Sequence, residues 1–402
     1  MQCKDDQGNP FECIEPPINS GGEGHIYRTT RRGYVIKVYN HIPLQGSHIK
    51  KLEAMIQKPP LNPQPNHVSI AWPERLAYNK KNECIGFLMP EIQKSIQIIQ
   101  VYNPVLRKKT LPKFSWKYLH HTALGFAKIV NALHFRDYII GDIKPQNILV
   151  NERALVSVVD TDSFQVKVPP HNVYRCTVTT EGFTPPELLS LNLANINQTK
   201  SHDRYRLALI IYHLLFFRHP FDEGTWIGNG DEPSQVDKMK DGIWLYSRSD
   251  VLQPNKLTIS LDVLHPELKK LFILCFNNGH NDVSKRPSAQ DWINALEEAN
   301  KSLKSCSITD NHVYYSNSGK CYWCDRSKTL NTDIFPGDKP AIPTLPPIKV
   351  PPVLPPIKDA SPEKKRFSGI VLAGLGLVIT FGGSPFWGIL MIVTGAIIVF
   401  HQ

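Results

Sequence analysis

The chain has 402 residues, of which 41% are apolar, and this composition excludes global disorder and allows one large or two-lobed domain with appendages. Its formal net charge of +10 permits contact with anionic lipid, nucleic acid or phosphate and by itself selects none of them. The eight cysteines are too widely spaced for a disulfide scaffold, and the first residues show no signal peptide. We therefore expect a reducing, cytoplasmic setting for most of the chain.

Two strands are expected near the start of the chain, in INSGGEGHIYR (Ile18–Arg28) and GYVIKVY (Gly33–Tyr39), with Gly33 in the turn between them. A glycine-rich hairpin lets backbone N–H groups approach phosphate oxygens closely. Against the pattern G-x-G-x-x-G-x-V, Asn19 replaces the first glycine, and GGEG alone also fits an ordinary turn. The candidate nucleotide-binding residues of this hairpin are Gly21, Gly22, Gly24 and Ile26.

Lys37 lies in an apolar strand, so its ammonium group needs an anionic partner, and the phosphates of ATP supply one. A glutamate on a following helix is expected as a second partner. Glu53 is the only carboxylate between Lys37 and Glu74, and it lies in SHIKKLEAMIQK (47–58), which has a helical pattern. We therefore expect a Lys37–Glu53 ion pair, with an exposed helix glutamate as the alternative.

CIGFLMPEI (Cys84–Ile92) is typical of a buried strand that continues into a linker between two lobes. In that arrangement Met89 would lie at the rear of an adenine pocket. The backbones of Glu91 and Ile92 would then hydrogen-bond to the base. Any core strand could show the same pattern.

The stretch YIIGDIKPQNILV (Tyr138–Val150) places three polar side chains at a spacing that suits phosphoryl transfer. Asp142 is the candidate base that orients an attacking hydroxyl group. Lys144 can stabilise the charge of the transferred phosphoryl group, and Asn147 suits a Mg²⁺ ligand.

A second metal ligand is expected in VVDTDSF (158–164), whose two valines end the hydrophobic strand pattern LVSVV (155–159). Asp160 comes directly after this strand and is our primary candidate for Mg²⁺. Asp162 is the rival, because it lies only two residues further along the chain.

From about residue 15 to residue 300 the chain resembles the eukaryotic-like protein kinases, in an atypical bacterial branch. Further motifs agree in order, namely FTPPELL (183–189), HDRYRLALIIYHLLF (202–216), RHPF (218–221) and KRPSAQDW (285–292). The resemblance implies an α+β, two-lobed protein-kinase-like fold at 15–300, with a β-rich N-lobe and a helical C-lobe. It also implies an anchoring role for Asp203, a structural Glu187–Arg286 ion pair, and Ser or Thr as acceptor because Lys144 follows the base by two residues.

The chain departs from the family where the catalytic loop usually reads H-R-D. Ile140 could support the loop by apolar packing in place of the histidine, whereas Gly141 cannot bind an activation-loop phosphate as the arginine does. We therefore expect activity that does not depend on that phosphorylation, although Thr177, Thr179 and Thr180 could still be modified.

Residues 301–330 contain a cluster that suits tetrahedral Zn²⁺, because a small segment with four such ligands needs a metal to fold. Its candidate ligands are Cys306, His312, Cys321 and Cys324. A redox C-x-x-C pair and an incidental C-x-x-C pair are the alternatives. No helix-hairpin-helix pattern is visible, so nucleic-acid binding is not supported.

Residues 331–366 are expected to form a proline-rich linker that contains the repeat LPPIK, either as a spacer or as a ligand for a proline-binding partner. Residues 367–400 include no charged side chain and are broken by GGSP (382–385) at their midpoint. Because a bilayer-spanning helix needs roughly 20 residues, this segment predicts a C-terminal transmembrane helical hairpin, with one span plus a re-entrant piece as the alternative. KKR (364–366) places the linker on the cytoplasmic side.

Together these patterns predict a cell-membrane-tethered, cytoplasm-facing Ser/Thr protein kinase that uses ATP and Mg²⁺ and phosphorylates proteins. The first rival is a pseudokinase scaffold that binds nucleotide and recruits partners. The second is a small-molecule phosphotransferase on the same fold, against which the P-P-E element and Asp203 argue.

Overall fold

The computed structural model describes residues 1–168 and 172–337, which form a β-rich N-lobe and a helical C-lobe. The N-lobe is a closed antiparallel barrel in the order β1-β2-β3-β4-β6-β5, and β5 pairs with β1 to close it. The strands are β1 (Gln2–Asp5), β2 (Pro10–Ser20), β3 (Gly24–Thr29), β4 (Tyr34–Tyr39), β5 (Arg75–Tyr78) and β6 (Cys84–Pro90). The barrel thus begins before residue 15, the expected start of the domain, and closure leaves no free sheet edge.

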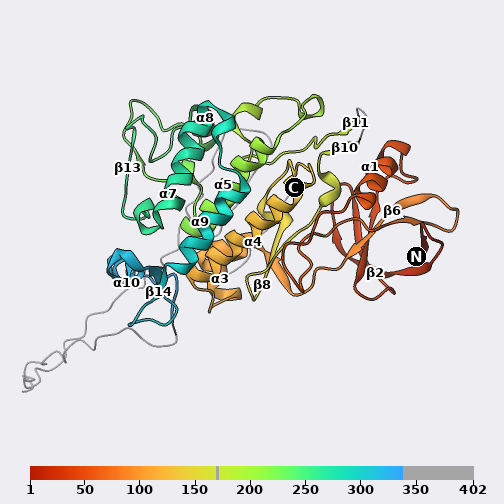
Figure 1. Ribbon diagram of the computed structural model, residues 1–402, viewed down its shortest axis with the longest axis horizontal. Helices are drawn as coiled ribbons and strands as arrows, with labels where there is room; N and C mark the ends of the chain where they lie inside the picture. Colours follow the sequence, from red (N-terminus) through yellow and green to blue (C-terminus); the bar gives the residue numbers. More distant parts are fainter. Residues whose placement is uncertain (169–171, 338–402) are drawn as a thin grey trace, which may run out of the picture. The chain divides into compact units, whose positions relative to one another are not determined.

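Alternation along β4 divides its side chains between two environments. Ile36 and Val38 belong to the cluster that fills the barrel. Val35 and Tyr39 point to the other face, where helix α1 (Gly46–Gln57) packs beside the barrel (Figure 1). Lys37 lies between Val35 and Tyr39 on this outer face, and the strand pattern therefore directs its ammonium group out of the barrel core.

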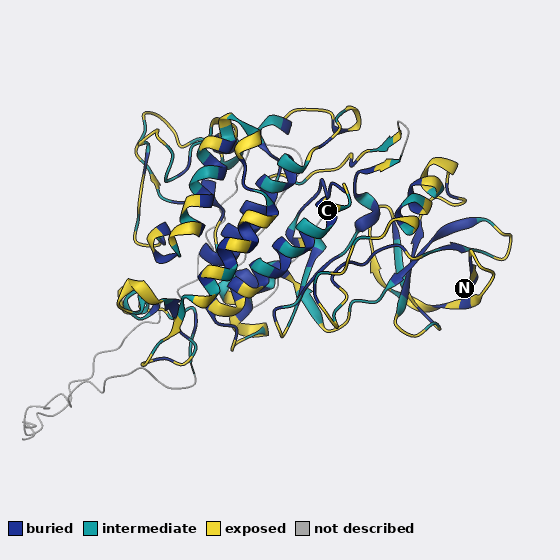
Figure 2. Ribbon diagram, in the orientation of Figure 1, coloured by how far each residue is buried: buried dark blue, intermediate teal, exposed yellow. Residues whose placement is uncertain are grey.

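The C-lobe is built around helix α5 (Lys200–Phe216), whose side chains, polar ones included, are buried along most of its length (Figure 2). Helix α4 (Trp116–Phe135) contacts both α5 and α9 (Ala289–Lys301). The other helices are α2 (Ile98–Tyr102), α3 (Pro104–Thr110), α6 (Gln235–Asp241), α7 (Pro266–Ile273), α8 (Gly279–Asn281) and α10 (Tyr322–Leu330). This packing gives the catalytic loop a rigid support.

A small antiparallel sheet at the start of the C-lobe holds the residues that bear the chemistry. It consists of β7 (Ser95–Gln97), β8 (Ile148–Asn151) and β9 (Val156–Val158). The catalytic loop enters β8, and VDTD follows β9, so the sheet places both segments at one end. Three two-stranded sheets pair β10 (Val166–Val168) with β11 (Asn172–Tyr174), β12 (Thr225–Trp226) with β13 (Leu252–Gln253), and β14 (Leu303–Ser305) with β15 (Val313–Tyr315).

The Cys/His segment packs against the C-lobe. Trp323 in α10 is buried, and its ring lies edge-on to Trp116 of α4, with ring centroids 5.1 Å apart. Arg107 of α3 donates to the Ile334 carbonyl oxygen at 3.1 Å and lies over the ring of Phe335. The segment therefore shares the C-lobe core and continues to at least Phe335, beyond the expected end at residue 330.

Most of the expected linker (331–366) and all of the expected membrane hairpin (367–400) lie outside the described residues. Within residues 1–168 and 172–337, none of the helices has both the length and the apolar character that a bilayer crossing requires.

Candidate active site

A cleft of about 570 Å³ between the two lobes brings together residues that are far apart in the sequence. Its lining comes from the glycine-rich hairpin, β4, the linker after β6, the catalytic loop and the segment after β9. It includes these expected site residues: Gly21, Gly22, Gly24, Ile26, Lys37, Met89, Glu91, Ile92, Lys144, Asn147 and Asp160. A cleft of this size is large enough for a nucleotide.

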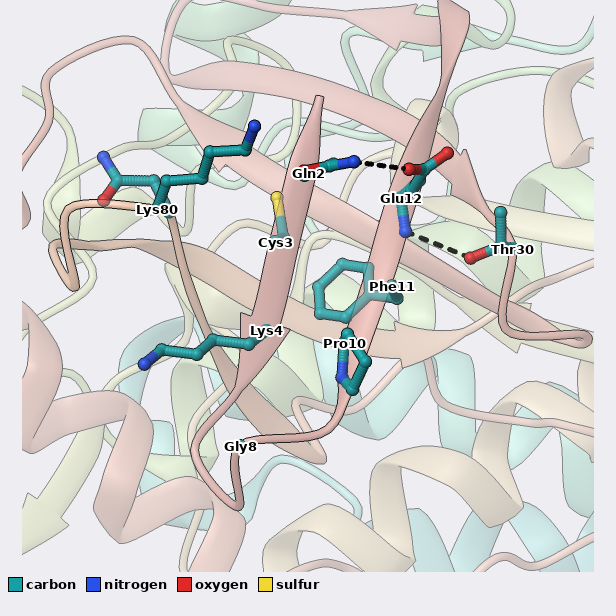
Figure 3. Close-up of a pocket in the computed structure, with 10 residues that line it drawn as sticks. Gln2, Cys3, Lys4, Gly8, Pro10, Phe11, Glu12, Thr30 and Lys80 are labelled. Carbon is teal, nitrogen blue, oxygen red and sulfur yellow. Dashed lines mark hydrogen bonds between the residues drawn. The ribbon is translucent and has the colours of Figure 1, made fainter.

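A second hollow, of about 620 Å³, lies at β1 and β2 and is shown in Figure 3. Cys3, Phe11 and Lys80 are among its lining residues, and Gln2 Nε2 donates to Glu12 Oε1 at 3.0 Å across the two strands. None of the expected site residues lines it, so size alone does not identify the functional site.

The glycine-rich hairpin is closed by a hydrogen bond from the Gly21 amide to the Gly24 carbonyl oxygen at 2.9 Å. A Cβ atom at Gly24 would lie 2.3 Å from the Val38 carbonyl oxygen, so this position requires glycine for close contact with β4. Cβ atoms at Gly21 and Gly22 would meet no atom within 4 Å. The tip of the hairpin therefore leaves its backbone open to a ligand.

Lys37 is buried and contacts three carboxylates at the inner end of the cleft. Its Nζ lies 2.7 Å from Asp162 Oδ2, 3.1 Å from Asp160 Oδ1 and 3.3 Å from Glu23 Oε2. Burial alone would lower the pKa of Lys37, but these carboxylates, Asp162 first, raise it above its ordinary value. Lys37 is therefore a fixed positive charge that can bind phosphate oxygens.

The expected Lys37–Glu53 ion pair is wrong. Glu53 is exposed, while Lys51, Leu52 and Met55 form the buried face of α1. Because successive helical residues are about 100° apart, a residue two positions after Lys51 points away from the cleft. Lys51 points inward instead, and its Nζ donates to the Asp162 carbonyl oxygen at 2.6 Å.

The linker after β6 agrees only in part with the contacts expected for a nucleotide base. Met89 is buried and lines the cleft. The Glu91 amide already donates to the Gly33 carbonyl oxygen at 2.9 Å, and the Glu91 side chain pairs with Arg28. The expected base contacts are therefore limited to the Glu91 carbonyl oxygen and the Ile92 backbone.

Asp142 is buried and has a polar partner on each carboxylate oxygen. Lys144 Nζ lies 2.6 Å from Asp142 Oδ2, and Thr180 Oγ1 donates to Asp142 Oδ1 at 2.9 Å. The two contacts fix the carboxylate in one orientation beside Lys144, which lines the cleft. Such an arrangement suits a base that positions a hydroxyl group.

Helix α5 holds the backbone of the catalytic loop through the side chain of Asp203. Amides of Ile140 and Gly141 donate to the two carboxylate oxygens of Asp203 at 2.8 and 3.0 Å. Ile140 is buried in the main core, which agrees with the expected apolar support. The anchoring role of Asp203 is thus present in the geometry.

Gly141 explains why the usual arginine is absent. Its φ is +78°, and a Cβ atom there would lie 2.6 Å from Cβ of the buried Cys176. The segment after β11 therefore packs directly onto the catalytic loop through Cys176, where an arginine side chain has no room.

Asp160 and Asp162 differ in exposure, and this separates their roles. The side chain of Asp160 is 36% exposed and lines the cleft with Asn147, whereas that of Asp162 is 4% exposed and accepts from Lys37 and Tyr39. Asp160 has a left-handed backbone, with φ of 59°, that turns it out of β9. Burial raises the pKa of Asp160 above its ordinary value, and Lys37 opposes this shift. Asp160 is therefore the better metal ligand.

The expected Glu187–Arg286 ion pair is present. Both terminal guanidinium nitrogens of Arg286 donate to the Glu187 carboxylate, at 2.6 and 2.7 Å. Arg286 also donates to backbone oxygens of Gly279 and Ser201, so the pair joins three parts of the C-lobe. It lies apart from the cleft and is structural.

The four expected zinc ligands meet in space. Their ligand atoms all lie within 4.8 Å of one another, in the group Cys306, His312, Cys321 and Cys324. His312 Nδ1 faces the Cys324 sulfur at 3.3 Å, and His312 Nε2 lies 3.0 Å from Asp333 Oδ1. A carboxylate on the far ring nitrogen is the usual support for a metal-bound histidine, so the donor set fits Zn²⁺.

Four residues at these sites were not assigned these roles from the sequence: Lys51, Asp162, Thr180 and Asp333. Asp162 was considered only as a metal ligand, and Thr180 only as a modification site. Alternation along β4 was the available signal for Asp162, because Lys37 and Tyr39 share a face that needs an acceptor. The other three contacts depend on tertiary packing and have no local signal.

Residues 73–296 match the family model described as the protein kinase domain, which is more than half of the chain. The two lobes, the cleft and the order of the motifs agree with that match. The chain therefore belongs to the protein kinase family. The match begins at residue 73, so the glycine-rich hairpin and Lys37 lie outside it and are supported by the geometry of the cleft.

Two bacterial relatives align over most of this chain. Protein kinase YegI of Escherichia coli O157:H7 is 28% identical over 78% of this chain and 49% of its own length, and YegI of strain K12 is 28% identical over 76% and 47%. Human 3-phosphoinositide-dependent protein kinase 1 is 36% identical over 25% of this chain and 18% of its own length. The chain thus belongs with atypical bacterial protein kinases and spans about half the length of YegI.

Proposed function

We propose that the chain transfers the terminal phosphoryl group of ATP to Ser or Thr hydroxyl groups of proteins. The observation that carries this proposal is the position of Asp142 between Lys144 and Thr180, directly beside the cleft. Lys144 lines the same cleft as Lys37 and Asp160, so it links the buried Asp142 carboxylate to the nucleotide-binding groups.

The residues of the cleft fit ATP and Mg²⁺ by their chemistry. Asp160 and Asn147 offer the carboxylate and amide oxygens that Mg²⁺ accepts, together with water and phosphate oxygens. Mg²⁺ bound there would neutralise phosphate charge as it develops in the reaction. The open hairpin at Gly21 and Gly22 and the ammonium group of Lys37 would bind the phosphates.

Positioning and electrostatics account for the reaction step. The carboxylate of Asp142 accepts a hydrogen bond from the acceptor hydroxyl and takes its proton as the oxygen attacks phosphorus. Lys144 stabilises the negative charge on the transferred phosphoryl group, because its ammonium group lies beside Asp142. No covalent intermediate with the chain is required.

The preference for Ser or Thr is supported by Lys144 and Thr180. An aliphatic hydroxyl group, that of Thr180, already donates to Asp142, so this carboxylate can accept a hydrogen bond from a short hydroxyl side chain. The resemblance to the Ser/Thr kinase group, based on Lys144, agrees with this choice.

A nucleotide-binding scaffold without turnover is the second candidate function. The missing Lys37–Glu53 pair favours it, because many kinases need the corresponding pair for activity. Under this alternative the cleft binds ATP and the chain acts by recruiting other proteins.

Peptides that differ only in a Ser, Thr or Tyr acceptor test the proposal. We expect the purified chain with Mg²⁺ and ATP to phosphorylate the Ser and Thr peptides and not the Tyr peptide. ATP binding without transfer to any peptide would favour the scaffold. ATP consumption only with small alcohols or sugars would favour a small-molecule phosphotransferase.

We also propose that Cys306, His312, Cys321 and Cys324 bind one structural Zn²⁺. The support is the convergence of the four ligand atoms and the position of Asp333 behind His312. The site lies on the C-lobe core through Trp323, so the metal would brace the kinase domain.

Membrane tethering remains a proposal based on sequence. The uncharged segment 367–400 supports a membrane anchor with the kinase on the cytoplasmic side, and the LPPIK repeats support a proline-binding partner. Cell fractionation tests the anchor: the full chain should sediment with membranes, and a chain ending at residue 337 should not.

A further inference from the structure

The charges around Lys37 are arranged differently from the arrangement expected for a kinase. The helix that should supply a glutamate supplies Lys51, and the loop after β9 supplies Asp162. Asp162 is buried, and its Oδ2 accepts from both Lys37 Nζ at 2.7 Å and Tyr39 Oη at 2.6 Å. A buried carboxylate with two such donors has little freedom to move.

We propose that Asp162 is the positioning residue for Lys37, in place of a helix glutamate, and that Lys51 joins helix α1 to the same loop. The inference rests on the proposed function. In the arrangement expected from the sequence, a glutamate on helix α1 pairs with Lys37. The proposal gives this role to Asp162, the third residue of D-T-D.

The backbone pattern supports this assignment. Lys37 and Tyr39 are two residues apart in β4, so both side chains leave the strand on one face and reach the same oxygen of Asp162. Asp160 and Glu23 also contact Lys37, at longer distances and with more exposed side chains. The buried Asp162 is therefore the partner that sets the position of Lys37 before a nucleotide binds.

Helix α1 reaches this cluster through a different contact. Lys51 Nζ donates to the Asp162 backbone oxygen, and the ring of His48 stacks on Tyr39 at a centroid distance of 5.9 Å. A shift of α1 would thus move the loop that holds Lys37. The helix keeps its link to the active site although Glu53 faces solvent.

Metal binding by Asp162 is the competing role. Glu23, Asp160 and Asp162 bring three carboxylates within 4.8 Å, and Asp162 Oδ1 is buried without a hydrogen-bond partner among the described residues. If Asp162 were a Mg²⁺ ligand, its neutralisation would raise the Mg²⁺ requirement and leave metal-free nucleotide binding unchanged. Positioning of Lys37 and ligation of Mg²⁺ therefore predict different results when ATP binding is measured with and without Mg²⁺.

ATP binding in the presence of a chelator provides the first test, with the full chain and the variants Asp162→Asn and Glu53→Gln. We expect Asp162→Asn to weaken ATP binding about tenfold and Glu53→Gln to change it less than twofold. In a Lys37→Met background, Asp162→Asn should change ATP binding less than twofold, because its effect acts through Lys37. An equal loss in that background, or a change only in the Mg²⁺ requirement, would overturn the proposal.

The second test reads Lys37 itself and needs no phosphoryl transfer. Fluorosulfonylbenzoyl adenosine reacts with a neutral amine in a nucleotide site, and mass spectrometry follows the rate at which Lys37 is modified at about pH 8 with saturating reagent. Because this pH lies well below the raised pKa of Lys37, a fall of one unit in that pKa increases the neutral fraction tenfold, and we expect Asp162→Asn to raise the rate about tenfold. An unchanged rate in Asp162→Asn, or an equal increase in Glu53→Gln, would contradict the assignment. Both tests remain informative if the wild-type chain transfers no phosphate.

Lys51→Met tests the link to helix α1, and Lys50→Met, an exposed neighbour on the same helix, is the matched control. We expect only Lys51→Met to weaken ATP binding, by about fivefold. Equal effects of the two variants would show that Lys51 has no special link to the site.

Discussion

At the scale of single residues, the carboxylate of Asp142, the proposed catalytic base, is held by contacts that differ in kind. Lys144 contributes charge to Asp142, whereas Thr180 contributes a directional hydrogen bond from the segment before Pro185. Hydrogen bonds to charged groups contribute more than neutral ones, about 1.5–3 kcal/mol. The orientation of Asp142 therefore depends on the position of Thr180 as well as on its own loop.

Thr180→Val removes the hydroxyl group and keeps the shape of the side chain. We expect kcat for peptide phosphorylation to fall about 10- to 100-fold, which corresponds to the free energy of the lost hydrogen bond. Steady-state kinetics with a Ser peptide measures this. Thr180→Ser should restore most of the rate, and an equal loss in both variants would show that the hydroxyl group is not responsible.

Gly141→Ala places a methyl group against Cys176 at a backbone position with positive φ. Both effects destabilise the fold, and we expect a loss of about 1–3 kcal/mol in the free energy of unfolding. Urea denaturation measures the change. Gly46→Ala is the control, because a Cβ atom there meets nothing within 4 Å. Equal stability of the two variants would contradict the account of the missing arginine.

At the scale of elements, periodicity in the sequence identified most of the parts that form the site. The strand pattern around Lys37, the helix over 47–58 and the buried strand from Cys84 correspond to β4, α1 and β6. The prediction was wrong about which face of α1 lies toward the cleft. It relied on Glu53 being the only carboxylate in that stretch of the sequence. Its helical phase relative to Lys51, Leu52 and Met55 shows that it faces solvent.

The Cys/His segment is an element whose stability should depend on metal. Removal of zinc with a chelator should release one Zn²⁺ per chain and lower the melting temperature, because the metal would hold together ligands from three separate parts of the segment, at Cys306, at His312 and at the Cys321–Cys324 pair. Metal analysis and thermal denaturation measure both effects. Cys321→Ser should reduce the zinc content, and Cys13→Ser, outside the cluster, should not. Full zinc content in Cys321→Ser would exclude this ligand set.

At the scale of the whole molecule, the ordered motifs predicted the two-lobed fold, whereas three contacts came only from tertiary packing. Strand β1 closes the barrel from a stretch that has no distinct strand pattern. Asp162 meets Lys37 across 125 residues of chain, and Asp333 meets His312 beyond the last cysteine. The alternation along β4 indicates that Lys37 and Tyr39 need an acceptor, but no local pattern identifies the partner in any of the three contacts, because each depends on how distant elements pack.

Buried Glu223 makes the stability of the C-lobe depend on pH. Burial raises its pKa from 4.5 to about 7, although Arg218 and Arg326 oppose the shift. Because the folded-state pKa is the higher one, the stabilising contribution is present below pH 4.5 and is lost as pH rises through 7. Glu223→Gln should therefore raise the free energy of unfolding by about 3 kcal/mol at pH 8 and by about 1 kcal/mol at pH 5. Urea denaturation at both pH values measures this, and an equal effect at the two would refute it.

Phosphosite mapping by mass spectrometry, after incubation of the purified chain with Mg²⁺ and ATP, tests whether this cleft performs phosphoryl transfer. Asp142→Asn is the control, because it keeps the side-chain shape and should keep ATP binding while lowering transfer at least 100-fold. We expect phosphate on Ser or Thr residues of the wild-type chain or of an added protein, and none in the variant. Equal phosphorylation by both proteins, or ATP binding without phosphorylation by either, would contradict the account.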